Sequence, residues 1–342
     1  MKKRILICAL EPSANLHLAE ILKELEDYEI CGIFDEKFGE PFVKSSEFSA
    51  MGFFEILPLI FKAKKAIKAL TQMAQNVDSV LLLDSPAFNI PLAKALKKAQ
   101  IKAKITYFIL PQVWAWKPKR VKVVEANCDN LASIWPFEAK FYSKATYVGS
   151  PLLDEISLQN QANEEILAFL PGSRVSEITR LMPIFRELAL KFKDKRLLLP
   201  IPKHLMAKKD EIYGDLSAFE ICDDAPSALA RAKFAFICSG TATMQSALIG
   251  TPFVLCYKAK AIDIYIARKL VKLKYVGLAN IILDFMGESP LNTELIQEQV
   301  TASALYQAYE THDKEKFRKT REKLIQYLKF GSAKNVANLI KG

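Results

Sequence analysis

Two short segments in the second half of the chain place small residues directly after apolar runs. Residues 170–174, Leu-Pro-Gly-Ser-Arg, follow the run 166–169, and residues 239–243, Ser-Gly-Thr-Ala-Thr, follow the run 234–238. Each pattern predicts a buried strand, a tight turn and a helix start, which together aim unpaired backbone N–H groups at an anion. The guanidinium of Arg174 can bind two phosphate oxygens at once. We therefore expect a diphosphate site, with a nucleotide sugar as the favoured ligand; the alternative is that the small residues only make tight turns.

Carboxylates end two apolar runs in the first half of the chain. Asp84 follows the run 79–83, and Glu11 follows the run 5–10. Open parallel sheets bind ligands at the carboxyl ends of their strands, where partial burial raises the pKa of an acid and suits it to general base catalysis. Asp84 is our candidate base for a hydroxyl group, and Glu11 is a candidate for orienting an acceptor. The alternative for both is capping of the next helix.

Four other residues are candidates for contact with a ligand. Trp114 and Trp116 offer aromatic faces to a sugar ring or to acyl chains, and packing between domains is the alternative. His17 is a candidate for substrate contact, and the alternative is a core or capping histidine in the first helix. Asn280 is a candidate site residue, and formation of a surface turn is the alternative.

The composition bounds the class of protein. The chain has 342 residues, of which 51% are hydrophobic, and a net charge of +10. This length predicts two domains, and the charge favours anionic partners such as nucleotide phosphates or acidic lipid surfaces. Basic residues are not interleaved with aromatic ones as in single-strand nucleic-acid binders, so no nucleic acid partner is expected.

Several classes of site lack their sequence signature. The chain has no Gly-x-Gly-x-x-Gly, no Walker A lysine motif and no Ser-His-Asp order, which weakens dehydrogenase, nucleoside-triphosphatase and hydrolase interpretations. Six cysteines and three histidines are dispersed, so we expect a reducing compartment, with no metal site and no cofactor. The first apolar run is too short for a signal peptide, and no run approaches the ~20 residues of a spanning helix. A cytoplasmic location follows.

Apolar runs alternate with helical periodicity, which predicts an α/β fold with parallel sheets. We expect a first Rossmann-like domain over 1–155, a second over 156–320 and a helical segment over 321–342 that packs on the first domain or on a partner subunit. The region 292–339 is expected to be helical. The expected strands are residues 5–10, 30–34, 79–83, 105–110, 131–134, 166–170, 196–201, 218–221, 234–238 and 253–257, with helices at 16–25 and 91–99 among them.

Two stretches combine apolar residues with lysines at helical spacing. These are residues 53–74 and 262–275. Basic amphipathic helices of this kind can lie on an anionic membrane surface, and packing against the core with a solvated lysine face is the alternative.

Taken in order, short motifs along nearly the whole chain resemble the lipid-A-disaccharide synthase family. They are Glu11 with Ser13 and His17, Met51-Gly52 with Glu55, Asp84-Ser85-Pro86 with Phe88-Asn89, Val113-Trp114-Ala115-Trp116, Pro136-Phe137-Glu138, Val148-Gly149, Leu170-Pro171-Gly172-Ser173-Arg174 with Glu177, Ser239-Gly240-Thr241-Ala242-Thr243, Thr251-Pro252, Tyr257 and Asn280. The resemblance implies two Rossmann-like domains that face a central cleft, the GT-B arrangement. It also implies transfer of a 2,3-diacylglucosamine unit from its UDP derivative to 2,3-diacylglucosamine 1-phosphate, with inversion and a β-1,6 linkage.

The resemblance assigns roles to particular residues. Asp84, Glu11 and Arg174 would be catalytic, and no metal is implied. UDP would contact Gly172, Ser173, Arg174, Ser239, Gly240, Thr241, Ala242, Thr243, Gln245, Tyr257 and Asn280. Acceptor or acyl chains would contact Ser13, His17, Asn89, Trp114 and Trp116. A peripheral position on the anionic inner leaflet and a homodimer are further expectations.

The chain departs from the family pattern at five positions, which are Ala14, Asn15, Ala87, Ser150 and Gln245. Ala87 replaces a second aspartate and leaves Asp84 as the carboxylate of its loop. Gln245 replaces a glutamate and keeps hydrogen bonding without the strength of a charge. Two rival interpretations stay open here: a UDP-sugar epimerase of the same architecture, and a non-catalytic membrane-binding relative.

Overall fold

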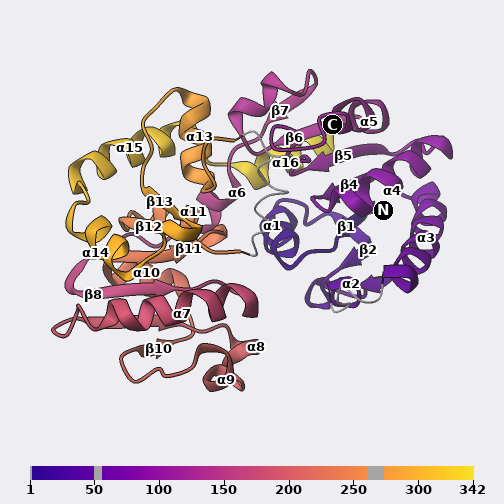
Figure 1. The fold of residues 1–342 in the computed structure, drawn as a ribbon. Coiled ribbons are helices and arrows are strands. Elements are labelled where there is room, and N and C mark those ends of the chain that lie inside the picture. Colours follow the sequence, from indigo (N-terminus) through magenta and orange to yellow (C-terminus); the bar gives the residue numbers. More distant parts are fainter. Residues whose placement is uncertain (1, 50–55, 260–272) are drawn as a thin grey trace. The chain divides into compact units, whose positions relative to one another are not determined.

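The structure is a computed structural model that describes residues 2–49, 56–259 and 273–342. The chain divides into two compact units, unit 1 of Met1–Asp154 with Leu328–Gly342, and unit 2 of Glu155–Tyr327. Each unit contains one parallel sheet with helices on both of its faces (Figure 1). The expected α/β architecture is therefore confirmed.

The sheet of unit 1 has seven parallel strands in the order β3-β2-β1-β4-β5-β6-β7. Strand order reverses between β1 and β4, so the switch point where such folds bind ligands lies between these two strands. The strands are β1 (Lys3–Ala9), β2 (Tyr28–Phe34), β3 (Val43–Lys44), β4 (Ser79–Leu83), β5 (Lys104–Phe108), β6 (Asn130–Ser133) and β7 (Ala145–Tyr147). The helices are α1 (Pro12–Lys23), α2 (Ser46–Ser49), α3 (Ile56–Met73), α4 (Pro86–Lys98), α5 (Arg120–Asn127), α6 (Pro151–Glu155) and α16 (Ser332–Lys341).

Helices cover both faces of this sheet because its central strands are apolar on both sides. Helices α3 and α4 pack on one face, where Leu70 and Leu92 join the core, and α1 packs beside α16 on the other (Figure 1). Asp154 caps the start of α16 by accepting the N–H of Ser332 at 2.7 Å, and Asn130 of β6 donates to the carbonyl of Leu339 at 3.0 Å. The last helix is thus part of unit 1.

The sheet of unit 2 has six parallel strands in the order β10-β9-β8-β11-β12-β13, with its switch point between β8 and β11. The strands are β8 (Asn163–Leu170), β9 (Arg196–Pro200), β10 (Glu220–Cys222), β11 (Ala232–Cys238), β12 (Phe253–Tyr257) and β13 (Thr293–Ile296). The helices are α7 (Val175–Ala189), α8 (Lys203–Met206), α9 (Lys209–Tyr213), α10 (Ala225–Arg231), α11 (Thr241–Ile249), α13 (Leu278–Met286), α14 (Ala302–Glu310) and α15 (Lys314–Tyr327).

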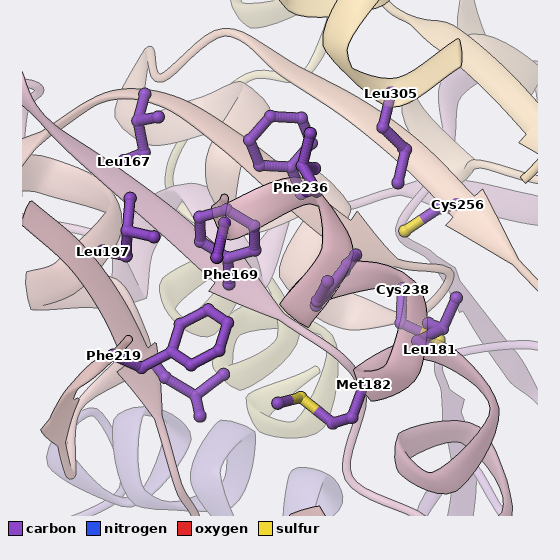
Figure 2. Packing of buried hydrophobic residues seen from close by; sticks show 14 of the residues in the cluster. Leu167, Phe169, Leu181, Met182, Leu197, Phe219, Phe236, Cys238, Cys256 and Leu305 are labelled. Carbon is purple, nitrogen blue, oxygen red and sulfur yellow. The ribbon is translucent and has the colours of Figure 1, made fainter. Parts of the chain in front are cut away.

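Aromatic rings form the centre of the unit 2 core. The ring of Phe169 lies 4.8 Å from that of Phe236 and 5.3 Å from that of Phe219, measured between centroids (Figure 2). Such ring pairs add to the free energy gained by burying apolar area. This core fixes the ends of β8 and β11, from which both predicted diphosphate turns emerge.

Every expected strand is present, with differences at the ends. The expectation of helix throughout 292–339 is wrong at its start, because β13 is an edge strand. Its four residues include no fully buried side chain, so they lack the apolar run that marks the central strands. The short strands β3 and β7 were also not predicted. Helix α15 runs unbroken to residue 327, so the C-terminal segment of unit 1 begins later than the expected residue 321.

The two amphipathic stretches have different outcomes. Helix α3 covers most of 53–74, whereas residues 53–55 and most of 262–275 lie outside the described residues. Within the described part of the chain, no helix is both long enough and apolar enough to cross a bilayer.

Candidate functional site

A cavity of about 430 Å³ opens at the carboxyl edge of the unit 2 sheet. It lies at the switch point between β8 and β11, where the two predicted turns meet. Its lining residues include Gly172, Ser173, Arg174, Glu177, Asp223, Ser239, Gly240, Thr241 and Ala242. The structure therefore brings together the two segments that sequence spacing had singled out separately.

The first turn depends on a glycine. Gly172 has φ of +107°, a conformation that side chains disfavour, and a Cβ there would lie 2.5 Å from Oε2 of Glu177. Glu177 is buried at the start of α7, where its other oxygen accepts a hydrogen bond from Nη1 of Arg174 at 2.9 Å. The Arg174 side chain is 78% exposed. Glu177 thus orients a guanidinium whose remaining surface faces solvent at the cavity.

The second turn presents the beginning of α11. Thr243 ties the first turn of α11 to this segment, because its hydroxyl donates to the carbonyl of Gly240 at 2.8 Å. A Cβ added at Gly240 would meet no atom within 4 Å, so the backbone is open on that side. The first N–H groups of a helix have no partner within the helix. Those of Thr241 and Ala242 are accordingly placed to bind an anion in the cavity.

The charge that this cavity offers to an anion comes from Arg174 and from the two helix starts, α7 and α11. All six cysteines are free thiols. Among the described residues, no group of three His, Cys, Asp or Glu side chains is placed to hold a metal ion.

The two carboxylates of unit 1 follow neighbouring strands. Ala9 of β1 pairs with Leu83 of β4, so Glu11 and Asp84 leave the sheet at adjacent strand ends, across the switch point. Asp84 has φ of +47°, in the left-handed region that non-glycine residues seldom adopt. Its N–H donates to the carbonyl of Phe108 at 2.9 Å, which ties the loop to β5.

The surroundings of Asp84 favour a role as a base. Burial raises its pKa above the ordinary value, and the N–H of Ser85 and the nearby His17 oppose that shift more weakly. The ring of His17 lies 6.4 Å from that of Phe108, at the same edge of the sheet. Glu11 and Ser13 are exposed at the start of α1. The structure thus groups Glu11, His17 and Asp84 at one edge of unit 1.

Comparison with known proteins decides the family. The model of the family described as lipid-A-disaccharide synthetase matches residues 5–340. The chain belongs to the lipid-A-disaccharide synthase family. A lipid-A-disaccharide synthase of Campylobacter jejuni (strain RM1221) is 53% identical over 362 aligned positions, which cover 99% of each chain. Lipid-A-disaccharide synthases are glycosyltransferases of lipid A biosynthesis, so the non-catalytic alternative is set aside.

Solved structures share the fold at low identity. MurG of Acinetobacter baumannii aligns with a TM-score of 0.64 at 13% identity, covering 100% of this chain and 99% of that one. UDP-GlcNAc 2-epimerase from Neisseria meningitidis bound to UDP-GlcNAc aligns with a TM-score of 0.55 at 13% identity, covering all of both chains. The fold alone does not separate glycosyltransferases from epimerases. The sequence family does, and it favours the synthase over the epimerase.

Other residues expected at the synthase site lie deeper than the cavity surface. Asn280 is fully buried in α13, where its amide donates to the carbonyl of Asn292 at 3.0 Å and to Glu294 at 2.8 Å. It therefore connects α13 to β13 and is not part of a surface turn. Thr243 is 1% exposed, whereas Gln245 and Tyr257 are half-buried. None of these four residues is among those that line the cavity, so their contact with UDP stays a prediction.

Glu138 is a buried acid. From the sequence it was recognised only as part of the motif Pro136-Phe137-Glu138, with no role of its own. Its carboxylate accepts hydrogen bonds from Nε1 of Trp114 at 3.2 Å and from the hydroxyl of Ser133 at 2.7 Å. Burial raises its pKa to about 7. Trp114 is thus fixed to the interior of unit 1, while Trp116 is 42% exposed. Trp116 is therefore the more exposed of the two tryptophans.

Proposed function

We propose that this enzyme joins 2,3-diacylglucosamine from its UDP derivative to 2,3-diacylglucosamine 1-phosphate. The cavity between the turns after β8 and β11 carries the proposal, because its size and N–H groups suit a diphosphate and its position is that of nucleotide sites in such folds. Unit 2 would hold the UDP moiety, and the carboxyl edge of unit 1 would hold the acceptor.

The proposed step is a single displacement. Asp84 takes the proton of the acceptor 6-hydroxyl as that oxygen bonds to the anomeric carbon of the donor. The bond from this carbon to the diphosphate oxygen breaks, and UDP leaves with the electron pair. The raised pKa of Asp84 supports this role, because a more basic carboxylate accepts a proton more readily. Attack opposite the leaving group inverts the anomeric configuration.

The reaction also requires that the charge on the leaving diphosphate be stabilised. Arg174 and the N–H groups of α7 and α11 are fixed before the reaction, so they stabilise the developing charge without reorganising. Glu177 contributes by holding the guanidinium at 2.9 Å. Glu11 is proposed to orient the acceptor from the end of β1.

The experiment that tests this assignment compares Asp84→Asn with the exposed-site control Asp215→Asn. Turnover is measured as release of UDP and formation of disaccharide, and UDP affinity is measured by calorimetry. We expect Asp84→Asn to lose a factor of about 10²–10⁴ in turnover and to keep UDP affinity. The control should keep both. Near-normal turnover of Asp84→Asn would contradict the assignment of the base.

A peripheral position on the inner leaflet is a second part of the proposal. Helix α3 buries Ala66 and Leu70 in the unit 1 core, while Phe61 on the same helix is 70% exposed. Lys64 and Lys65 are exposed next to it. Each cation near an anionic surface contributes about 1 kcal/mol of binding free energy.

Flotation with phosphatidylglycerol vesicles tests this position. The variant Lys64→Glu with Lys65→Glu should lose vesicle binding at low salt. The matched control is Lys334→Glu with Lys341→Glu, which changes the charge equally on the exposed face of α16 and should still float. Equal binding of both variants, or binding that ignores salt, would contradict a role for α3.

A further inference from the structure

A loop at the carboxyl edge of unit 1 leaves the sheet beside the proposed base. Residues 109–119 connect β5 to α5, and β5 pairs with β4. The hydroxyl of Tyr107 donates to the carbonyl of Asp84 at 2.7 Å, and the N–H of Asp84 donates to the carbonyl of Phe108 at 2.9 Å. The end of β5 is therefore bonded directly to the Asp84 loop.

Contacts beneath this loop hold it in place. The indole N–H of Trp114 is bonded to the buried Glu138, and its ring meets Phe137 edge-on at 5.4 Å. The hydroxyl of Tyr142 donates to the carbonyl of Pro111 at 2.9 Å. Val113 is 4% exposed. The first part of the loop is thus anchored, which sets the direction in which the residues after it project.

The residues after the anchor form a cluster of charge around one ring. Lys117 Nζ lies 4.0 Å and Arg120 Cζ lies 5.3 Å from the ring centroid of Trp116. Both distances are within the range of cation–π attraction, so the ring gathers two cations. Among the described residues, no carboxylate lies within ion-pair distance of either cation. Their charge is therefore available to an anionic ligand.

We propose that Lys117 and Arg120 bind the phosphate monoester of the acceptor substrate. The inference rests on the proposed function, in which the acceptor is a sugar 1-phosphate and Asp84 acts on its 6-hydroxyl. A phosphate monoester carries about −1.5 to −2 charges at pH 7, and a guanidinium binds two of its oxygens. The 6-hydroxyl and the 1-phosphate are at separate positions of one sugar. The two cations follow β5, whose end is bonded to Asp84, so this edge of unit 1 suits a sugar that presents both groups.

The phosphate of an anionic lipid headgroup has the same chemistry as that of the acceptor. A site for the acceptor makes binding depend on the 1-phosphate of a single sugar. A site for headgroups makes vesicle binding depend on the same two cations. Separate measurements of acceptor binding and of vesicle binding, made on the same variants, therefore distinguish the two sources.

The first measurement is equilibrium binding in detergent of 2,3-diacylglucosamine 1-phosphate and of the same sugar without its phosphate. We expect the unaltered enzyme to prefer the phosphorylated form at least tenfold. The variant Lys117→Ala with Arg120→Ala should lose this preference, and Arg120→Lys should keep part of it. The control Lys122→Ala, an exposed lysine on the same helix, should keep all of it. Melting temperatures identify any variant that is not folded.

A preference that survives in the double variant, or that is absent from the unaltered enzyme, overturns the inference. Loss of vesicle binding with an unchanged phosphate preference also overturns it, in favour of lipid headgroups. Asp84→Asn separates this test from that of the proposed function, because it should retain the phosphate preference while turnover falls. UDP affinity should be unchanged in the double variant, since the nucleotide cavity lies in unit 2.

Discussion

The side-chain amide of Asn89 lies behind Asp84 and donates to its carbonyl oxygen at 2.9 Å. The same nitrogen lies 2.9 Å from the carbonyl of Leu83, so Asn89 bonds both sides of the point where β4 ends. Asn89 is fully buried in α4. It therefore supports the left-handed conformation of Asp84 from within the protein, and the acceptor contact expected for it from the sequence stays a prediction.

An equivalent asparagine lies behind Glu11. Asn15 of α1 donates to the carbonyls of Ala9 at 3.1 Å and Glu11 at 3.0 Å, and it accepts the N–H of Asp35 at 2.8 Å. Each carboxylate at the unit 1 switch point thus has a buried amide that holds its backbone. An aspartate is usual in the family at position 15. The amide here serves the donor bonds that a carboxylate does not make, so this departure is compatible with an intact site.

Removing the amide behind Asp84 should lower both stability and rate. Asn89→Ala leaves the carbonyl of Leu83 without its side-chain donor, and we expect it to lower the free energy of unfolding by about 2 kcal/mol. The loop around Asp84 loses support, so turnover should fall at least tenfold while UDP affinity is kept. Urea denaturation and steady-state kinetics measure the two effects. Asn127→Ala, which removes one bond to a backbone carbonyl in α5, should leave turnover unchanged.

Two glycines of the cavity proposed to bind UDP should respond differently to alanine. Gly172→Ala requires a side chain at φ of +107° and a Cβ 2.5 Å from Glu177, whereas a Cβ at Gly240 meets no atom within 4 Å. We expect Gly172→Ala to lower the free energy of unfolding by about 1–2 kcal/mol and to weaken UDP binding. Gly240→Ala should unfold at the denaturant concentration of the unaltered enzyme. Equal stability of the two variants would mean that the turn at 172 does not need a glycine.

Replacement of Arg174 tests how the diphosphate is held. Arg174→Ala should weaken UDP binding by roughly 10–100-fold, since a charged hydrogen bond contributes about 1.5–3 kcal/mol. The remaining affinity should depend less on salt. Arg174→Lys should recover only part of the loss, because an ammonium lacks the two-pronged geometry. Glu177→Gln is the matched control: it keeps the packing at Gly172, weakens only the orientation of Arg174, and should cost less affinity than Arg174→Ala.

Features that depend on residues close together in the chain could be predicted from the sequence, whereas features that depend on distant residues could not. β4 and β12 were predicted to the residue because their apolar runs end abruptly. Asp84 was found from the end of β4, and the two small-residue turns were found from the ends of β8 and β11. β13 was missed because a short edge strand lacks such a run. Glu138 could not be assigned a partner from sequence, because Trp114 is 24 residues away and only the fold brings them together. A surface turn was an alternative for Asn280 for the same reason, because only the fold brings its hydrogen-bond partners to it.

The buried carboxyl of Glu138 should make stability depend on pH. Its pKa is raised by burial from 4.5 to about 7, so the folded protein keeps a proton that the unfolded chain has lost between these values. The free energy of unfolding should therefore decrease as pH rises from about 4.5 to 7, by about 3 kcal/mol from this group, and then level off. Glu138→Gln removes the ionisation, so urea denaturation of this variant at pH 5 and pH 8 should lack that decrease. The exposed-acid control Asp215→Asn should retain it, and a slope shared by all three proteins would assign the effect to other groups.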